Sequence, residues 1–211
     1  MIGPLEQYID ADPNDRWSRL ALAENYRRMG RSDDALAALV GLQRGEPEVI
    51  DLLARIELDR QDVDKAEWLI ATGPPDDPLL ARLRGRLALA RRDAKSALGH
   101  FRIALAGDPL ARETLFGLTA ALELAGDPKA AGPYHQAAAN LDRLNSLVQR
   151  AATRGARTDR GLMRRFGAAC EALGLNELSR AWYNLAVSSD PLDSESQQAL
   201  YRLSHPKVSQ P

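Results

Sequence analysis

Hydrophobic and small positions recur along the chain at helical spacing and in a fixed order. In one segment, a small residue, an aromatic residue, a second small residue and a proline follow at steps of four, three and five: Ala97, Phe101, Ala104 and Pro109. Three other segments keep these steps: Ala35-Leu39-Leu42-Pro47, Ala66-Ile70-Gly73-Pro78 and Ser179-Tyr183-Ala186-Pro191. Steps of three and four place side chains on one helical face, and a proline five residues later ends the helix. The pattern predicts repeated helices, each followed by a turn.

A first helix is expected before each of these segments. In the unit that begins after Pro13, Ala23 and Tyr26 lie at helical spacing and Gly30 supplies a left-handed turn. The distance from the preceding proline to the small residue is 22 residues in this unit and 19 residues in the next two. We expect the three missing residues to come from the turn and the start of the first helix. Pro47 and Pro78 should then lie in the first helical turn, where a missing N–H is tolerated.

The order of residues in this unit resembles the tetratricopeptide repeat, a pair of helices of about 34 residues. The matching positions are Ala23, Tyr26, Gly30, Ala35 and Pro47, although Arg19 replaces the usual first tryptophan. The resemblance implies an all-α fold, an α-α superhelix in which antiparallel helix pairs form a right-handed solenoid. It also favours a bacterial repeat protein or a repeat domain excised from a larger chain.

The units divide the chain into five parts. We expect a partial repeat or N-terminal cap at 1–13, repeats one to four at 14–141, an extended or extra basic helix at 142–158, repeat five at 159–192, and a capping helix with a tail at 193–211. The fourth repeat departs from the pattern, because Gly132-Pro133 lies in its second helix and Arg143 stands where a proline is expected. Helical spacing continues beyond it.

Charge is balanced overall but uneven along the chain. The formal net charge of the 211 residues is −1, whereas residues 1–80 carry 17 acidic and 9 basic side chains. A basic flank follows in the second half: Arg143, Arg150, Arg154, Arg157, Arg160, Arg164 and Arg165. Nucleic-acid binding through this flank has weaker support than protein binding, because interleaved aromatic residues for base stacking are missing.

The sequence contains little that would support catalysis. It has one cysteine and three histidines, and no phosphate-binding loop or paired metal-ligand motif. We therefore expect no enzyme activity, no cofactor and no metal, with Cys170, His100 and His135 serving in packing or at the surface. No run of about 18 apolar residues occurs, so membrane insertion is not expected. The expected location is the cytoplasm, or the periplasm or a tethered position if the chain is a fragment.

Binding residues follow from the resemblance, because first helices line the concave face of a tetratricopeptide superhelix. Counting back from each turn gives these candidates: Trp17, Leu20, Glu24, Asp51, Arg55, Arg82, Arg86 and Phe116. Further extensions are Glu113, Arg164 and Arg165. The alternative for each residue is an ordinary solvated helix face. A carboxylate clamp known in one branch of the family is not expected, because Leu20 and Glu24 replace its first Lys and Asn.

The leading hypothesis is a non-enzymatic scaffold that binds a peptide segment of a partner protein in the concave groove. Trp17 and Leu20 would form an apolar anchor, and Arg55, Arg82 and Arg86 would meet acidic residues of the partner. The alternative is an accessory or regulatory domain of a larger kinase- or transferase-type enzyme. The sequence does not decide the oligomeric state.

Overall fold

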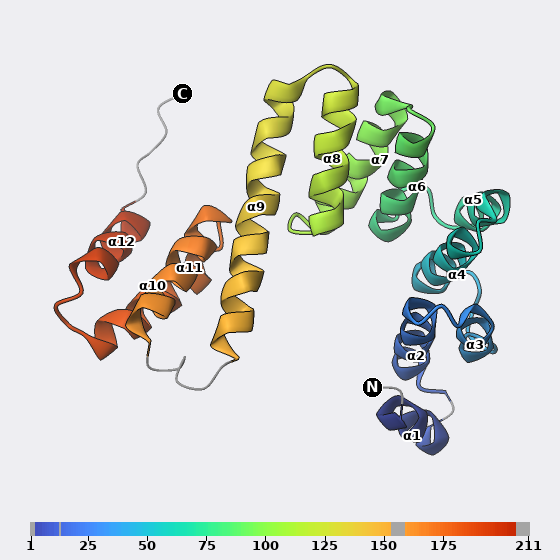
Figure 1. Cartoon of the computed structure of the whole chain (residues 1–211), viewed down its shortest axis with the longest axis horizontal. Helices are drawn as coiled ribbons and strands as arrows, with labels where there is room; N and C mark the ends of the chain where they lie inside the picture. The colour runs from blue at the N-terminus through green and yellow to red at the C-terminus, as the bar shows by residue number, and fades with distance from the viewer. Residues whose placement is uncertain (1–2, 13, 153–158, 206–211) are drawn as a thin grey trace. The chain divides into compact units, whose positions relative to one another are not determined.

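The regular elements of this protein are α-helices throughout the residues that the structure, a computed structural model, describes: 3–12, 14–152 and 159–205. Twelve helices lie in these ranges (Figure 1): α1 (Gly3–Ala11), α2 (Arg16–Arg28), α3 (Ser32–Ala38), α4 (Pro47–Asp59), α5 (Val63–Thr72), α6 (Pro78–Ala90), α7 (Ala94–Gly107), α8 (Arg112–Leu124), α9 (Pro128–Ala151), α10 (Arg160–Ala172), α11 (Asn176–Ser189) and α12 (Ser194–Ser204). The predicted all-α fold is confirmed. Pro13, Arg154, Arg157 and the tail after His205 lie outside the described residues.

The chain forms two compact units, Met1–Pro128 and Lys129–Pro211. The division falls between the helices of the predicted fourth repeat, since α8 closes the first unit and α9 belongs to the second. Within the first unit, α2 packs on α3, α4 on α5, and α6 on α7. The first helices of successive pairs also touch in order, α2 with α4, α4 with α6, and α6 with α8. This order places one helical face of each first helix in a continuous row.

The repeated small and aromatic positions form the interior of the helix pairs. Ala35, Ala66 and Ala97 are fully buried, as is the ring of Phe101. That ring lies against Gly85 of α6 and Gly117 of α8, where an added Cβ would collide with it. The periodicity therefore predicted the packing register correctly, because the residues that recur are those with least room around them.

The turn between the two helices of a pair contains a residue in the left-handed conformation at the same position each time. This position lies five residues before the small residue of the second helix, such as Ala35 or Ala97. The five turn residues and their φ values are Gly30 (74°), Gln61 (66°), Arg92 (58°), Gly126 (82°) and Gly174 (72°).

The second and third repeats are three residues shorter than the first, but, contrary to expectation, the missing residues do not come from the turn and the first helix. α2, α4, α6, α8 and α10 all contain 13 residues, so the short repeats have lost neither turn nor helix. The missing residues come from the linker before the first helix. Pro47 and Pro78 each stand at the helix start, as predicted.

Aspartate side chains cap at least six of the described helices. In each case a side-chain oxygen accepts a hydrogen bond from a backbone N–H of the first turn, at Asp15, Asp62, Asp77, Asp93, Asp159 and Asp193. Such a cap satisfies a donor that has no partner within the helix and stabilises it by about 1 kcal/mol.

The second unit begins with the long helix α9, which has 24 residues and contains Pro133. Residues 142–151 of the stretch expected to hold an extended or extra helix are therefore a continuation of α9, and the expected boundary between 141 and 142 falls inside this helix. Near its middle, Asn140 Nδ2 donates to the carbonyl oxygen of Ala172 at the end of α10, 3.3 Å away. Phe166 of α10 stacks on Trp182 of α11 with ring centroids 4.4 Å apart. Among the described residues, no helix is both long and apolar enough to span a bilayer.

Candidate functional site

The first helices of the first unit present one row of polar and aromatic side chains. Residues three, four and seven apart lie on the same side of a helix, which aligns Trp17 with Glu24 on α2, Asp51 with Arg55 on α4, Arg82 with Arg86 on α6, and Glu113 with Phe116 on α8. Because these helices touch in order, their rows are neighbours. We call this surface the first-helix face.

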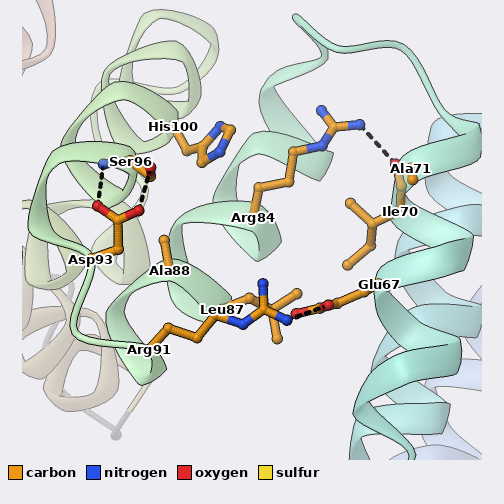
Figure 2. A pocket seen from close by; sticks show the side chains of 10 residues that line it. All are labelled: Glu67, Ile70, Ala71, Arg84, Leu87, Ala88, Arg91, Asp93, Ser96 and His100. Carbon is orange, nitrogen blue, oxygen red and sulfur yellow. Dashed lines mark hydrogen bonds and ion pairs between the residues drawn. The ribbon is translucent and has the colours of Figure 1, made fainter.

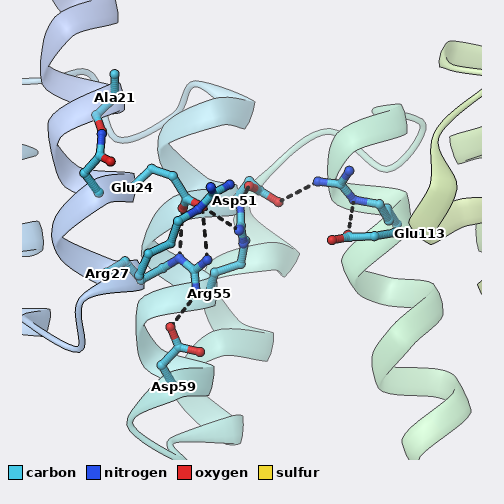
Figure 3. Close-up of polar contacts among 10 residues, drawn as sticks. Ala21, Glu24, Arg27, Asp51, Arg55, Asp59 and Glu113 are labelled. Atoms are coloured by element: carbon cyan, nitrogen blue, oxygen red, sulfur yellow. Dashed lines mark hydrogen bonds and ion pairs between the residues drawn. The ribbon is translucent and has the colours of Figure 1, made fainter. Parts of the chain in front are cut away.

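Five charged side chains form a ladder of alternating sign across this face (Figure 3). Arg55 Nη2 donates to Glu24 Oε1 at 3.1 Å, and Arg55 Nη1 donates to Asp51 Oδ2 at 3.3 Å. Arg82 lies between two carboxylates, with its Nη2 3.9 Å from Asp51 Oδ1 and its Nε 3.5 Å from Glu113 Oε2. The structure thus brings together residues from four helices. The charges within the ladder largely neutralise one another.

Glu24 is the most strongly held carboxylate of the ladder. Arg27 Nε donates to it at 2.9 Å and Arg28 Nε at 2.6 Å, in addition to Arg55. Burial alone would raise the pKa of Glu24, but the hydrogen bonds from Arg27 and Arg28 and the charge of Arg55 outweigh burial and lower this pKa to about 2. Arg27 also reaches Asp59, with Nη1 2.6 Å from Oδ2. Glu24 therefore stays ionised and joins α2 to α4.

Asp51 and Arg82 are less well satisfied. Asp51 is buried, which raises the pKa of its carboxyl group, although Arg55 and Arg82 oppose this shift. Asp51 Oδ1 and Arg82 Nε are buried atoms without a hydrogen-bond partner among the described residues. Buried polar atoms in proteins normally have such a partner. The middle of the ladder is therefore where a further acceptor for Arg82 would be most favourable.

Aromatic side chains flank the ladder on its two outer helices. Trp17 is 64% exposed, and the guanidinium of Arg16 lies 4.6 Å from the centre of its ring. Phe116 is 38% exposed, and the guanidinium of Arg112 lies 4.5 Å from its ring. Arginine stacking holds each ring in place without covering it completely. Both aromatic candidates are thus accessible.

Leu20 and Arg86 differ from each other in accessibility. Leu20 is 9% exposed and packs in a core cluster with Ala23, Leu52 and Ile56. Little of the Leu20 side chain is therefore left for the surface anchor expected beside Trp17, because α4 covers it. Arg86 is exposed and has no ion pair among the described residues. It is the most available cation of the first-helix face.

The candidates chosen from the sequence omit three members of this network, Arg27, Arg28 and Asp59, and include two residues that lie in the second unit. Arg27 and Asp59 extend the ladder. Helical spacing predicts that each lies at the surface of its own helix, but it does not predict that the two side chains pair between α2 and α4. Arg164 and Arg165 lie in the second unit, where Arg164 Nη1 pairs with Glu195 Oε2 at 3.0 Å and Arg165 is exposed. The site described here therefore belongs to the first unit alone.

A cavity of about 290 Å³ between α5, α6 and α7 contains His100 and Arg84 (Figure 2). Arg84 donates to four backbone carbonyl oxygens at the end of α5 and in the following turn, those of Ile70, Gly73, Pro74 and Pro75. Burial lowers the pKa of His100, and the charge of Arg84 adds to this effect. Arg84 thus serves to hold the turn.

The remaining candidates for chemistry are isolated from one another. Cys170 is buried, and burial raises the pKa of its thiol. Within the part of the chain that the structure describes, no group of three or more His, Cys, Asp or Glu side chains could hold a metal ion.

Comparison with known proteins defines the class of fold. No protein-family model matches the sequence, and no curated protein matches it either. Among solved structures, the chain matches one in the crystal structure of the APC/C hetero-tetramer Cut9-Hcn1 with a TM-score of 0.50 and 17% sequence identity. The match covers 94% of this chain and 38% of that chain. The protein therefore has an all-helical repeat fold of the tetratricopeptide type. The chain spans less than half of the one it resembles.

Proposed function

We propose that this protein is a non-enzymatic scaffold whose first-helix face binds a segment of a partner protein. The observation that carries the proposal is the state of the two arginines of α6. Arg82 Nε has no hydrogen-bond acceptor, and Arg86 has no ion pair among the described residues. An acidic side chain of a partner would pair with Arg86 and with the part of the Arg82 guanidinium that stays exposed, since the Arg82 side chain is 22% exposed. Charge-assisted hydrogen bonds to carboxylates are stronger than neutral ones.

The dimensions of the face favour an extended segment. Helices in contact are separated by 8–10 Å between axes, so the three steps from α2 to α8 span about 24–30 Å. An extended chain advances about 3.3 Å per residue, so about seven to nine residues would cross the face. Trp17 and Phe116 at its two sides would receive bulky apolar side chains, while Arg82 and Arg86 would meet acidic residues between them.

The ladder limits which charges are available to the partner. Arg55 already donates to Glu24 and Asp51, so the proposal assigns it to positioning the carboxylates and not to contact with ligand. A rigid, self-paired surface costs little ordering entropy on binding. Affinity would then come from the aromatic flanks, with the α6 arginines selecting for acidic residues.

The test is selection from a library of random peptides of about nine residues, followed by titration of selected peptides against variants. Trp17→Ala should weaken binding by about 30-fold, because a truncated hot-spot aromatic costs about 2 kcal/mol. Arg82→Gln combined with Arg86→Glu should weaken it and slow association. Arg102→Glu is the matched control, since Arg102 is an exposed arginine of α7 outside this face.

Two results would contradict the proposal. One is a selected family of peptides without acidic residues, or with basic ones in their place. The other is normal binding by Trp17→Ala together with loss of binding by Arg102→Glu, which would assign the working surface to the second helices. Unchanged thermal unfolding of each variant shows that an altered affinity reflects contact.

A further inference from the structure

A second hollow lies on the opposite helices of the first unit, among α3, α4 and α5. Its volume is about 600 Å³, and we call it the second-helix groove. The side chains that line it are predominantly apolar: Leu36, Leu39, Val40, Val49, Leu53, Trp68 and Leu69. A hollow of this size and character is typical of sites that receive side chains or small ligands.

The groove borders α3, which is short, and the segment that follows it. α3 has 7 residues, whereas α5 has 10 and α7 and α11 each have 14. The chain leaves α3 after Ala38 and turns through Gly41, whose φ is 91°. A longer helix would have covered the neighbouring side chains of α4 and α5. The missing turns of helix leave that space empty.

Two large apolar side chains are unusually exposed at this groove. Val40 is 68% exposed and Trp68 is 65% exposed. Exposed apolar residues are ordinary when scattered singly, but a concave apolar surface with an exposed tryptophan marks an interaction site. Trp68 was not among the residues predicted to bind a partner, because those candidates were taken from the first helices and Trp68 lies on the second helix α5.

The one acidic side chain that lines the groove is paired with cations, whereas one basic side chain at its rim has no carboxylate partner in the described part of the chain. Glu57 is buried, and its Oε1 lies 2.8 Å from Lys65 Nζ and 4.0 Å from Arg60 Nη1. These cations neutralise the carboxylate that lines the groove. Arg44 is exposed and forms no ion pair or hydrogen bond among the described residues. The groove therefore presents an apolar floor with an uncompensated positive charge at its rim.

We propose that the second-helix groove binds a short amphipathic helix of a partner protein that carries acidic residues at one end. The lining residues Val49 and Glu57 lie eight positions apart on α4, so the groove extends about 12 Å along that helix. This length matches two turns of a ligand helix. Apolar side chains at spacings of three and four would enter between Val40 and Trp68, and an acidic side chain would pair with Arg44. This site is independent of the first-helix face.

The test uses a designed probe, an acetylated and amidated helical peptide of about 15 residues. It carries leucines three and four residues apart and glutamates at one end. Two further peptides replace the leucines with alanine or the glutamates with lysine. The chain contains three tryptophans, so their indole N–H signals in ¹⁵N-labelled protein report on binding. The Trp68 signal should shift with the probe, and the Trp17 signal should not.

Variants then separate the two surfaces. Trp68→Ala and Arg44→Glu should each weaken binding of the probe by at least tenfold. Both side chains are exposed, and thermal unfolding of each variant checks that the fold is kept. Trp17→Ala, which removes an equally exposed tryptophan of α2, is the matched control and should bind the probe normally.

Four results would overturn the proposal. They are an unmoved Trp68 signal, equal binding of the alanine peptide, equal binding of the lysine peptide, and normal binding by Trp68→Ala.

Sedimentation equilibrium tests whether a second copy of the protein occupies the groove. If the protein self-associates and Trp68→Ala abolishes this, a second copy fills the groove and the partner-helix proposal is wrong. A monomeric protein with a Trp68-dependent probe site supports it.

Discussion

Arg84 makes the largest single polar contribution that we expect to the stability of the first unit. Its Nη2 donates to the carbonyl oxygens of Ile70 and Gly73 at 2.8 and 3.2 Å, and its Nη1 donates to those of Pro74 and Pro75 at 2.9 and 2.8 Å. One guanidinium therefore satisfies the end of α5 and fixes the proline turn that leads into α6.

Replacing this side chain by alanine should cost about 2–4 kcal/mol. Hydrogen bonds from charged groups contribute about 1.5–3 kcal/mol each, but these four share one group and two of them are exposed. The partly buried bonds to Ile70 and Gly73 dominate the estimate. Arg84→Lys should recover part of the loss, because an ammonium group donates to several carbonyls but lacks the planar fork of arginine.

Urea unfolding measures the effect as a shift of the midpoint at constant m. Arg86→Ala is the matched control, because Arg86 lies on the same helix, is exposed and has no ion pair among the described residues. It should change stability by less than about 0.5 kcal/mol. Hydrogen exchange at Gly73 and Asp77 should accelerate in Arg84→Ala. Equal midpoints for the Arg84 and Arg86 variants would refute this account of the turn.

Four further perturbations, three substitutions and one change of pH, each have a predicted effect on stability. Gln61→Gly should stabilise by about 1 kcal/mol in urea unfolding, because its φ of 66° is unfavourable for a residue with a Cβ; a loss of stability would mean that its side chain has an important contact. Gly117→Ala should destabilise by about 1–3 kcal/mol, since its new methyl group would press on the buried Phe101 ring. Gly99→Ala, also within a helix but with open space around its Cα, should stabilise by about 0.5–1 kcal/mol, and the same sign for both would contradict the packing. The pKa of Glu24 is lowered to about 2 from 4.5, so its contribution is complete above pH 4.5 and is lost as pH falls toward 2. After allowance for solvent screening we expect a loss of about 1–2 kcal/mol, which Glu24→Gln should abolish in acid titrations.

The sequence predicted the repeat register because that register depends on local steric requirements. Ala97 and Phe101 recur at their spacing because two helices approach closely at one position and leave room for a ring at the other. Pro47 was placed at a helix start for an equally local reason, the absence of its N–H. These features need no knowledge of distant residues.

Features that depend on neighbouring helices were less predictable. Gln61 adopts a left-handed conformation because the packing of its helix pair requires the same turn as Gly30, and this overrides local preference. Helical spacing identified Glu24 and Arg55 as surface candidates, but it could not predict that they pair, because the pairing depends on the contact between α2 and α4. The burial of Leu20 depends on the same contact, which decides which side of α2 is covered.

The electrostatics of the two proposed surfaces have a common consequence for binding. Residues 1–80 carry 17 acidic and 9 basic side chains, so an acidic partner approaching the first unit meets an unfavourable field at long range. Arg44 and Arg86 attract it at short range, because neither forms an ion pair among the described residues, and Arg82 adds to this attraction because its contacts with Asp51 and Glu113 are long, at 3.9 and 3.5 Å. Salt screens exposed charges beyond about 10 Å at 0.1 M, and thus weakens the distant repulsion more than the contacts. Affinity at both surfaces should therefore depend weakly on salt, and differences in affinity among partners should follow the apolar residues that meet Trp17 or Trp68. A steep loss of affinity with salt would instead indicate that charge dominates recognition.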